Sequence, residues 1–537
     1  MKQQRLARWF GAFAGLALLA SGLPAMHTQA QTAAEFSGIV FEDLNQNGAY
    51  DTDEQGIAGV AVSNGREVVQ TGAGGAYTLP LYDGMVVFAV KPSGYAFPLD
   101  ENNLPRFSYV YEPNGSPEFI AEYDGVAPTG ELPASVDFAL VKVDELDTFD
   151  ALMVGDTQVT NGDEVSYLRD DIVSELTDTG AELALMMGDN VNDNLSLYDR
   201  YLSVMSAIGL PMYFVPGNHD TNYDSPNEQY QYETFKRFFG PTYYSFNYGQ
   251  VHFVILDDVM WDGSAYHGEL GEQQLEWLAN DLALVPQDAL IVLNMHIPLA
   301  SWQDRASAQH ALADRDQMFA LLEGRPAIAL AGHTHTLERF MPGEEVEGWG
   351  EAMPIQQIIV GAACGSWWSG DKDERGIPAS YQRDAAPNGY MIFHFEGNQF
   401  SEQYIPAGSP VSDNMILSFD SRLGANTPQD VVTPGELSST TLVANIFSGS
   451  RESAVDYRID DGPAVPMTKD NNVTDPYVMA QTASLEDWLY PVSSTHIWTA
   501  PLSTDLTPGA HTITVTTTDM YGQTFEGVKV FEVWATE

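Results

Sequence analysis

Residues 327–335 read AIALAGHTH, a short apolar run that ends in a glycine and two histidines one residue apart. The length and composition of the run predict a buried strand, so the histidines would lie in the loop beyond its carboxyl end. Two histidines in one loop can belong to an ordinary turn, and the pair alone does not distinguish that from a metal site. The chain holds only 11 histidines in 537 residues, however, and the surrounding sequence repeats the pattern of a strand followed by a polar loop.

An alternation of strand-like and helical segments extends from about residue 150 to residue 404. Helices are predicted at 164–179 and 270–284, where apolar residues recur every three or four positions. This alternation is typical of a layered α/β domain. The strand-like runs lie at 151–155, 183–187, 212–215, 251–256, 290–295, 327–331 and 357–360.

Five of these runs lead directly into side chains that can bind metal. Because the loops beyond strand carboxyl ends build the ligand sites of open α/β sheets, we expect these side chains to converge. Carboxylate, amide and imidazole groups together suit Mn, Fe or Zn better than calcium. In chain order the residues are Asp156 and Gln158, then Asp189, then Asn218 with His219 and Asp220, then His296, and finally His333 and His335.

Together these blocks resemble the calcineurin-like metallophosphoesterase family, whose motifs run Asp-x-His, Gly-Asp, Gly-Asn-His-Asp/Glu, a lone His and Gly-His-x-His. The resemblance covers residues 150–400, and its strength lies in five blocks that occur in the right order at strand ends. It implies a β-sandwich flanked by helices that carries two metal ions bridged by an aspartate. It further implies that Asp156, Asp189 and His335 hold one ion, while Asp189, Asn218, His296 and His333 hold the other.

The resemblance also implies the chemistry. A metal-bound hydroxide would attack phosphorus while the two ions clamp the transferring group. His219 would protonate the leaving alkoxide, with Asp220 orienting its ring. The sequence departs from the family pattern at Gln158, which stands where many members have histidine. Its neutral amide oxygen is either a weaker ligand of the first ion or a cap of the loop.

Two adjacent tryptophans follow the GHTH loop in the stretch GAACGSWWSG at 361–370. If this segment returns to the rim of the site, Trp367 and Trp368 would bind substrate by stacking on a base, a sugar or an acyl group. The alternative is that they seat the C-terminal part of the chain against the catalytic domain.

The flanking sequences predict two β modules around the catalytic domain. From Glu35 to about Lys142, short apolar runs alternate with Gly, Asn and Asp turns, and Asn64-Gly65 signals a hairpin. After Gly408, runs rich in β-branched residues predict an immunoglobulin-like sandwich. The predicted fold is therefore multidomain, with a central α/β metallophosphoesterase sandwich between an N-terminal all-β module and a C-terminal immunoglobulin-like β module. The predicted segments are a signal peptide at 1–30, the N-terminal module at 31–142, a linker at 143–149, the catalytic domain at 150–407 and the C-terminal module at 408–537.

Residues 43–54, which read DLNQNGAYDTDE, place oxygen-bearing side chains at the spacing of a calcium-binding loop. In such a loop, positions 1, 3, 5, 9 and 12 supply ligands and a glycine at position 6 permits the bend. Strand-like segments flank the loop, and it resembles the calcium-binding B-type repeats of bacterial surface proteins. The alternative is an acidic turn that binds nothing. The predicted ligands are Asp43, Asn45, Asn47, Asp51 and Glu54.

The N-terminus and the charge of the chain bear on its location. Lys2, Arg5 and Arg8 precede an apolar run at 9–19 and small residues at 28–30, which is typical of a secretory signal peptide. No later stretch is long and apolar enough to cross a bilayer. The net charge of −52 disfavours nucleic-acid polymers and anionic membranes as partners. The single cysteine, Cys364, excludes disulfides within the chain.

We therefore expect a periplasmic or secreted hydrolase of small phosphate esters that uses two transition-metal ions, divalent or trivalent, with structural calcium as an additional ion. No obligate protein partner is evident. Two alternatives stay open: a periplasmic nucleotidase, and a calcium-stabilised surface or adhesion protein whose metallo-domain is inactive. His252 lies inside an apolar run, and we expect it to be a satisfied core residue.

Overall fold

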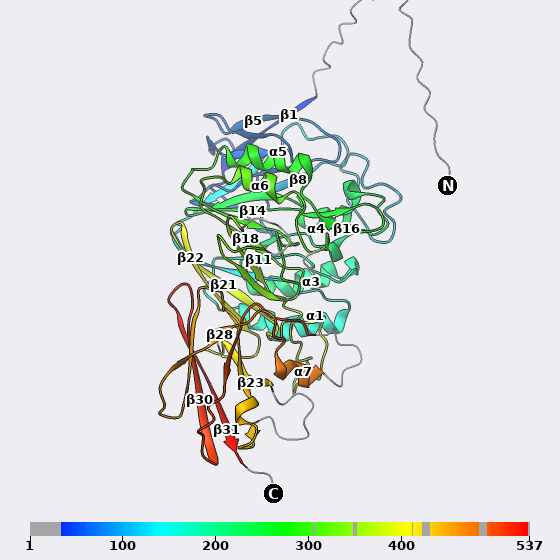
Figure 1. Ribbon diagram of the computed structural model, residues 1–537. Coiled ribbons are helices and arrows are strands. Elements are labelled where there is room, and N and C mark those ends of the chain that lie inside the picture. Colours follow the sequence, from blue (N-terminus) through cyan, green and yellow to red (C-terminus); the bar gives the residue numbers. More distant parts are fainter. Residues whose placement is uncertain are drawn as a thin grey trace, which may run out of the picture.

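The computed structural model describes residues 34–303, 307–346, 352–410, 412–420, 430–482 and 491–534. The predicted signal peptide at 1–30 lies outside these residues. The molecule is elongated, with the N-terminal strands at one end, a layered α/β part in the middle and the C-terminal strands at the other end (Figure 1). Among the described residues, no helix combines the length and the apolar character that a membrane span requires.

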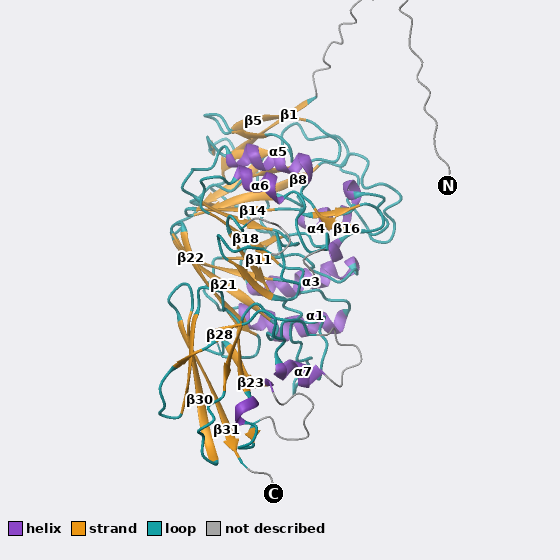
Figure 2. Ribbon diagram, viewed as in Figure 1, coloured by secondary structure: helices purple, strands orange, loops and turns teal. Residues whose placement is uncertain are grey.

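The central part contains two sheets that pack face to face, with helices on the outside (Figure 2). The first sheet has the strand order β12-β11-β10-β21-β22, and the second has the order β13-β14-β17-β18-β20-β19. The first consists of β10 (Thr148–Val154), β11 (Leu183–Met186), β12 (Met212–Phe214), β21 (Gly389–Glu396) and β22 (Gln399–Pro406). The second consists of β13 (Tyr244–Tyr248), β14 (Val251–Ile255), β17 (Leu290–Asn294), β18 (Ala327–Ala331), β19 (Leu337–Phe340) and β20 (Gln356–Val360).

The seven predicted strands of this part are confirmed, with ends that differ by a few residues at most. They are apolar on both faces because each sheet lies between the other sheet and a layer of helices. In β10, Ala151 and Met153 join the core between the sheets. Leu152 and Val154 point the other way, into the core beneath the helices. Strands β10, β11 and β12 are parallel, as are β14, β17, β18 and β20, so their carboxyl ends meet at a common edge.

Both predicted helices form. The first is divided into α1 (Gly162–Leu168), a π-helical turn (Arg169–Val173) and α2 (Ser174–Leu176). Its start is fixed by Asn161, whose side chain accepts hydrogen bonds from the backbone N–H groups of Asp163 and Glu164. The second is α5 (Gly271–Leu282), which buries Leu275, Leu278 and Leu282. The remaining helices of the central part are α3 (Tyr198–Met205), α4 (Glu233–Phe239) and α6 (Arg315–Leu321).

The N-terminal part is all-β, as predicted. One sheet holds β1 (Glu35–Glu42), β2 (Gln55–Gly56), β5 (Ala76–Pro80), β7 (Tyr95–Ala96) and β9 (Phe138–Lys142), and the other holds β3 (Ala61–Ser63), β4 (Val68–Gln70), β6 (Val86–Ala89) and β8 (Ser108–Val110). The predicted hairpin forms between β3 and β4, although its loop has four residues. The apolar core of the N-terminal part is continuous with the core between the two central sheets.

Residues 143–149, predicted as a linker, take part in this continuity. Glu145 forms a buried ion pair with Lys91 at 2.5 Å, and Lys91 also donates to the backbone oxygen of Asn247 in β13. Strand β10 already begins at Thr148. The N-terminal strands are therefore joined to the central part by buried charge and backbone contacts.

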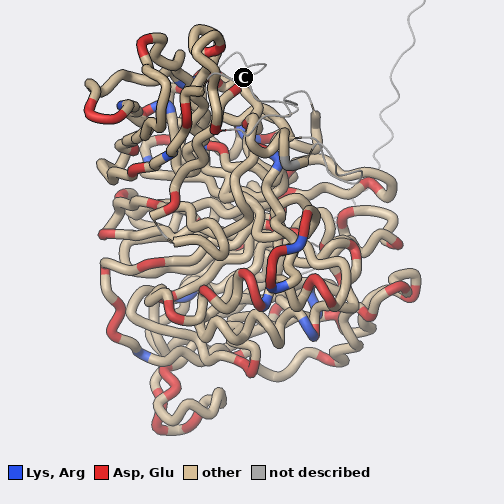
Figure 3. The backbone as a smooth tube through the Cα atoms, turned by 90° about the horizontal axis from the view of Figure 1, so that it is seen from below, with Lys and Arg blue, Asp and Glu red and all other residues tan. Residues whose placement is uncertain are grey.

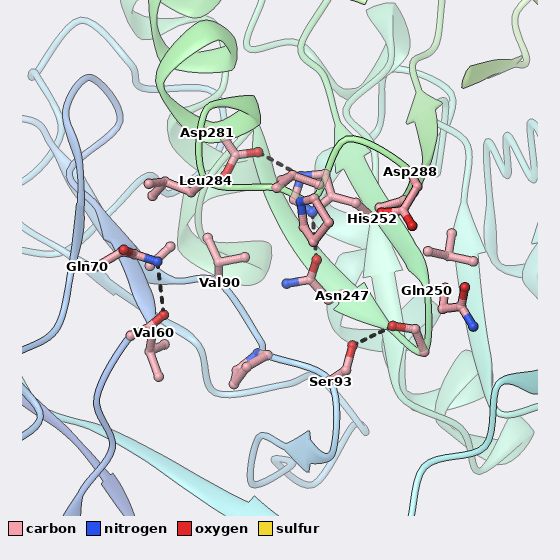
Figure 4. A pocket seen from close by; sticks show the side chains of 18 residues that line it. Val60, Gln70, Val90, Ser93, Asn247, Gln250, His252, Asp281, Leu284 and Asp288 are labelled. Atoms are coloured by element: carbon pink, nitrogen blue, oxygen red, sulfur yellow. Dashed lines mark hydrogen bonds and ion pairs between the residues drawn. The ribbon is translucent and has the colours of Figure 1, made fainter. Parts of the chain in front are cut away.

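A cavity of about 370 Å³ lies between the N-terminal strands and the second central sheet. Figure 4 shows His252 on its wall, between Asp281 and Asn247. The two ring nitrogens each lie 2.8 Å from an oxygen, one of Asp281 and one of Asn247. His252 is buried, so the prediction of a satisfied core residue is confirmed.

The C-terminal part consists of two sheets with a shared apolar core. The first holds β23 (Met415–Phe419), β25 (Thr441–Ile446), β28 (Thr468–Lys469) and β29 (Ile497–Pro501), and the second holds β24 (Val431–Val432), β26 (Ala454–Ile459), β27 (Val465–Pro466), β30 (Gly509–Thr518) and β31 (Thr524–Val533). The runs rich in β-branched residues form strands, and the immunoglobulin-like character of this part stays a prediction. A short helix, α7 (Pro476–Thr482), lies beside β23.

Acidic residues are spread over the whole molecule, while lysine and arginine are sparse (Figure 3). The chain has 75 Asp and Glu against 23 Lys and Arg. Such an excess of negative charge repels polyanions.

Candidate metal centre

The predicted metal-binding residues converge at the edge where the parallel strands of the two central sheets end. Most of them have an unusual backbone. Of the twelve non-glycine residues with positive φ in the described chain, eight lie in these loops. Such backbone strain costs of order 1–3 kcal/mol per residue and persists only where the surroundings enforce it, which is typical of functional sites. The eight are Asp156, Gln158, Asp189, Asp193, His333, His335, Trp367 and Trp368.

Three side chains surround the Nε2 atom of His296. This nitrogen lies 3.1 Å from Oδ1 of Asn218, 3.2 Å from Nδ1 of His333 and 3.3 Å from Oδ2 of Asp189. The Nδ1–H group of His296 donates to the backbone oxygen of Met187 at 3.0 Å, which leaves the lone pair of Nε2 directed at the other groups. The ligand atoms of Asp189, His296 and His333 all lie within 4.8 Å of one another.

These contacts fit a cation. The atoms that face one another are a carboxylate oxygen, an amide oxygen and two imidazole nitrogens, all of which can offer lone pairs. Burial alone would lower the pKa of His296, but the charges of Asp189 and Asp156 raise it to about 10. The position therefore favours positive charge, and a bound metal ion would supply that charge in place of a proton.

A second group of side chains that can bind metal, His335 and Asp156, lies next to the group around His296. The Nδ1–H of His335 donates to the backbone oxygen of Gly365 at 2.5 Å, and its Nε2 lies 3.6 Å from Oδ1 of Asp156. This Nε2 is buried and has no hydrogen-bond partner among the described residues. Burial lowers the pKa of His335 to about 3, so the ring is neutral and its lone pair is available. Burial also raises the pKa of Asp156 to about 8, with a contribution from the nearby charge of Asp189.

Gln158 joins the two groups. Its amide nitrogen donates to Oδ2 of Asp189 at 2.9 Å, and its oxygen lies 3.7 Å from the sulfur of Cys364. Burial would raise the pKa of Asp189, but His296 and His219 lower it overall. Asp189 thus remains a carboxylate, hydrogen-bonded to Gln158 and 3.3 Å from Nε2 of His296.

His219 lies at the open side of the centre, with about a quarter of its side chain exposed. Its backbone N–H donates to Asp189 at 2.8 Å, and its Nδ1 lies 2.7 Å from a carboxylate oxygen of Asp193. Burial opposes protonation, but the charges of Asp189 and Asp193 raise the pKa of His219 to about 9. The ring is therefore cationic at neutral pH and can release a proton from Nε2.

The prediction that Asp220 orients the His219 ring is wrong. Asp220 is fully buried and accepts hydrogen bonds from the hydroxyl of Tyr198 and from N–H groups of Gly217 and Asn190. It fixes the shapes of the loops that carry Asp189 and Asn218. The sequence analysis missed Asp193, the actual partner. A signal was available, since Asp193 follows Asp189 by four residues in the same loop.

The two tryptophans behave differently. Trp368 is buried, and its indole N–H donates to the backbone oxygen of Thr157 at 3.0 Å. Its predicted role in stacking on substrate is therefore wrong, and it supports the loop that carries Asp156. Trp367 stacks on the ring of His335, with 4.1 Å between ring centroids. These contacts of Trp367 and Trp368 are with the catalytic domain, and they do not seat the C-terminal strands against it.

Three tyrosines that the sequence analysis missed surround the open side. The hydroxyl of Tyr223 donates to the backbone oxygen of Asn218, and the hydroxyl of Tyr123 donates to that of Asp193. The ring of Tyr266 meets that of His333 edge-on at 5.9 Å. Tyr123 belongs to the N-terminal part, so that part of the chain contributes to the rim of the centre.

The five predicted calcium ligands lie together in one loop. Asp43 and Glu54 are buried, and their carboxylates accept hydrogen bonds from backbone N–H groups of the loop, among them those of Gly48 and Asp51. Asn45 and Asn47 both donate to Oδ2 of Asp51, at 2.9 and 3.0 Å. The five side chains are thus linked by hydrogen bonds within one loop.

Comparison with known proteins matches three consecutive stretches of the chain to related families. Residues 151–337 match the calcineurin-like phosphoesterase family. Residues 44–121 match the N-terminal domain of calcineurin-like phosphoesterases, and residues 358–525 match their C-terminal domain. The C-terminal match begins within the central sandwich, at β20.

Curated relatives are similar over part of the chain. A 3′,5′-cyclic adenosine monophosphate phosphodiesterase of Escherichia coli is 29% identical over 163 residues, which are 29% of this chain and 54% of the relative. A 3′,5′-cyclic-nucleotide phosphodiesterase of Nostoc sp. is 26% identical over 29% of this chain and 56% of its own length. Purple acid phosphatase 15 of Arabidopsis thaliana is 26% identical over 35% of this chain and 40% of its own length. The chain thus spans about half the length of these relatives.

Two solved structures align with this chain. A purple acid phosphatase from yellow lupin aligns with a TM-score of 0.35 and 13% identity, covering 68% of each chain. PhoD aligns with the same TM-score and identity over 72% of this chain and 90% of its own.

The residues that gather at these strand ends all lie within the stretch that matches the calcineurin-like phosphoesterase family. The chain belongs to the calcineurin-like phosphoesterases that carry dedicated N-terminal and C-terminal domains.

Metal binding is expected to stabilise the fold. After treatment with a chelator, addition of Mn²⁺ or Zn²⁺ at about 100 times the dissociation constant should stabilise the protein by about 2.7 kcal/mol and raise its melting temperature by several degrees. Calorimetry of wild type beside Asp189→Ala and Asp199→Ala tests this. Asp199 is an exposed aspartate of α3, so its variant should keep the shift, whereas the Asp189 variant should lose it. An equal shift in the Asp189 variant would contradict the assignment.

Proposed function

We propose that this protein is an exported hydrolase that uses two bound metal ions to cleave a small phosphate ester, either a monoester or a diester. The observation that carries the proposal is the gathering of Asp189, Asn218 and His333 around one nitrogen of His296, at 3.1–3.3 Å. Buried groups of this kind repel or leave one another unsatisfied unless a cation lies among them. The names of the curated relatives, phosphodiesterases and a phosphatase, support the same reaction class.

In this proposal, Asp189 bridges two ions. Asp156, Gln158 and His335 complete one site, while Asn218, His296 and His333 complete the other. The mixed nitrogen and oxygen donors favour Mn, Fe or Zn. When bound, two such ions supply Lewis-acid activation of water and of the phosphoryl group.

His219 acts as the acid. Asp193 accepts from Nδ1, so Nε2 is the atom that carries the transferable proton. The raised pKa keeps the ring charged at neutral pH, and a proton delivered to the leaving oxygen avoids the release of a free alkoxide. Asp193 therefore acts as the positioning residue for this step, the role that the sequence pattern suggested for Asp220.

The surroundings favour a small substrate. The acidic surface disfavours approach of a nucleic-acid polymer. Tyr223, Tyr266 and Trp367 lie around the open side and offer ring surfaces for the organic part of an ester.

We also propose that the loop at 43–54 binds one calcium ion as a structural element. The chain has a single cysteine and therefore no internal disulfide to stabilise its N-terminal strands. An ion bound by Asp43 and Glu54 would hold the two ends of the loop together next to β1 and β2. Dissociation constants for such loops range widely, up to about 1 mM in extracellular modules.

Hydrolysis is tested first with generic substrates. The metal-loaded protein should hydrolyse bis-p-nitrophenyl phosphate or p-nitrophenyl phosphate, and comparison of the two sets its preference. Asp189→Ala should reduce kcat/KM by at least about 10³-fold, since it removes the bridge between the ions. Asp199→Ala should retain wild-type activity. Failure of both substrates to react with metal-saturated wild type would count against the proposal.

Removal of the His219 partner should change the pH profile. The negative charge of Asp193 favours protonated His219, so Asp193→Asn lowers the pKa of His219. Activity that depends on the protonated ring is present below the pKa of His219 and is lost as pH rises through it. In Asp193→Asn, the fall of activity on the basic side of the pH profile should therefore occur at lower pH. At pH 8 we expect about a tenfold loss of kcat for an alkyl ester and a smaller loss for a p-nitrophenyl ester, whose leaving group needs no proton. Asp199→Asn, at the exposed aspartate of α3, serves as the control, and an unshifted limb in Asp193→Asn would refute the acid role.

Calcium binding is measured on the full chain in an Asp189→Ala background, which weakens the other metal sites. We expect one calcium ion to bind by calorimetric titration and the binding to disappear in Asp43→Asn. Asp53→Asn, at an exposed acid of the same loop outside the ligand positions, should bind as before. Equal binding in all three variants would show that the loop is only an acidic turn.

A further inference from the structure

The C-terminal part contacts the back of the GHTH loop through its segment 492–496. The backbone N–H of Val492 donates to the backbone oxygen of Arg383 at 2.7 Å. The side chain of Gln303 donates to the backbone oxygen of Ser493 at 2.7 Å, and the hydroxyl of Thr495 donates to that of Leu337 at 3.3 Å. Leu337 is the first residue of β19 and lies two positions after His335.

The strongest link in this contact runs through a buried histidine. The Nε2–H of His496 donates to Oδ2 of Asp384 at 2.9 Å, and the side chains of both are at most 1% exposed. The same oxygen accepts the backbone N–H of Leu337 at 2.5 Å. Two hydrogen bonds therefore connect a side chain of the C-terminal part to the start of the strand behind the metal-binding loop.

Arg383, next to Asp384, holds the other side of the segment 334–337, and we call these two residues the clamp. The backbone N–H of Arg383 donates to the backbone oxygen of His335 at 2.9 Å, and its guanidinium reaches the oxygen of Thr334 at 3.5 Å. Arg383 and Asp384 thus hold both sides of the segment 334–337. Asp384 is itself held from the C-terminal part by His496 and by the amide of Asn445, which donates to its backbone oxygen at 3.3 Å.

His335 has little freedom to absorb a movement of this clamp. Its backbone is in the left-handed region, its Nδ1–H is bonded to Gly365, and its ring stacks on Trp367. A displacement of Leu337 by a few tenths of an ångström would therefore be transmitted to the Nε2 atom that faces Asp156. Partners that orient metal-binding histidines commonly change metal affinity or activity by 10–100-fold when they are altered.

We propose that the C-terminal domain is part of the metal-binding machinery, with His496 as a positioning residue that sets His335 through Asp384. The inference rests on the proposed function, because it assumes that His335 binds a metal ion. The C-terminal domain would then help to position the loop that binds the metal ion.

The test compares two amide substitutions at one buried position in the full-length protein. His496→Gln places an amide N–H where Nε2 lies, whereas His496→Asn ends one bond short and leaves Asp384 without this donor. His511 provides the matched control, since it belongs to the same domain and bonds to Asp460 and to the backbone oxygen of Thr507 in the other sheet. Metal dissociation constants for Mn²⁺ and Zn²⁺ are measured by calorimetric titration, together with melting temperatures of the chelated proteins.

We expect His496→Asn to weaken binding of one of the two ions about tenfold, while His496→Gln stays within about threefold of wild type. His511→Asn should keep wild-type affinity even where it lowers the melting temperature. Equal affinities for both His496 variants and wild type, or an equal loss in His511→Asn, would overturn the positioning role. If wild type binds no transition metal at all, the proposed function itself fails, and this outcome is distinct from the others.

Discussion

The rest of the structure depends on one unfavourable arrangement, in which lone-pair atoms of Asp189, Asn218, His296 and His333 face one another in a buried site. Such a gathering is costly, because each atom loses water, and the donors that Asp189 gains from Gln158 and His219 leave acceptor atoms facing one another. The scaffold holds them there by several devices. Parallel strands end at one edge, loops adopt left-handed backbone conformations, and carbonyl groups of Met187 and Gly365 fix the two imidazoles that matter most. All of these features make sense together once a cation compensates the arrangement.

The histidines of the centre show how environment divides one residue type into separate roles. Burial holds His335 neutral, as a ligand must be. Neighbouring carboxylates hold His219 charged, and its partial exposure suits the acid role proposed for it. His252, with the same chemistry, is enclosed between Asp281 and Asn247 and serves packing alone. The distinction lies in the surroundings of each ring, which tertiary structure creates.

The sequence was informative where local pattern determines structure. Apolar runs predicted the central strands closely because strands buried on both faces need an unbroken apolar stretch. The polar residues after those runs predicted the centre, since parallel strands must bring their ends together. Contacts between distant segments were beyond such reasoning. Asp220 adjoins His219 in the sequence and Asp193 precedes it by 26 residues, and only the fold decides which carboxylate meets its ring. The burial of Trp368 and the continuous core beneath the N-terminal strands have the same origin.

The hydrogen bonds that reach the centre from both ends of the chain have a consequence for how such proteins can evolve. Tyr123, from the N-terminal strands, meets the loop of Asp193, and His496, from the C-terminal strands, meets Asp384. A recombination event that exchanged either flanking segment for an unrelated one would break a contact beside the reactive groups. The three segments are therefore linked by contacts near the centre, even though each resembles an independent module when the sequence is considered alone.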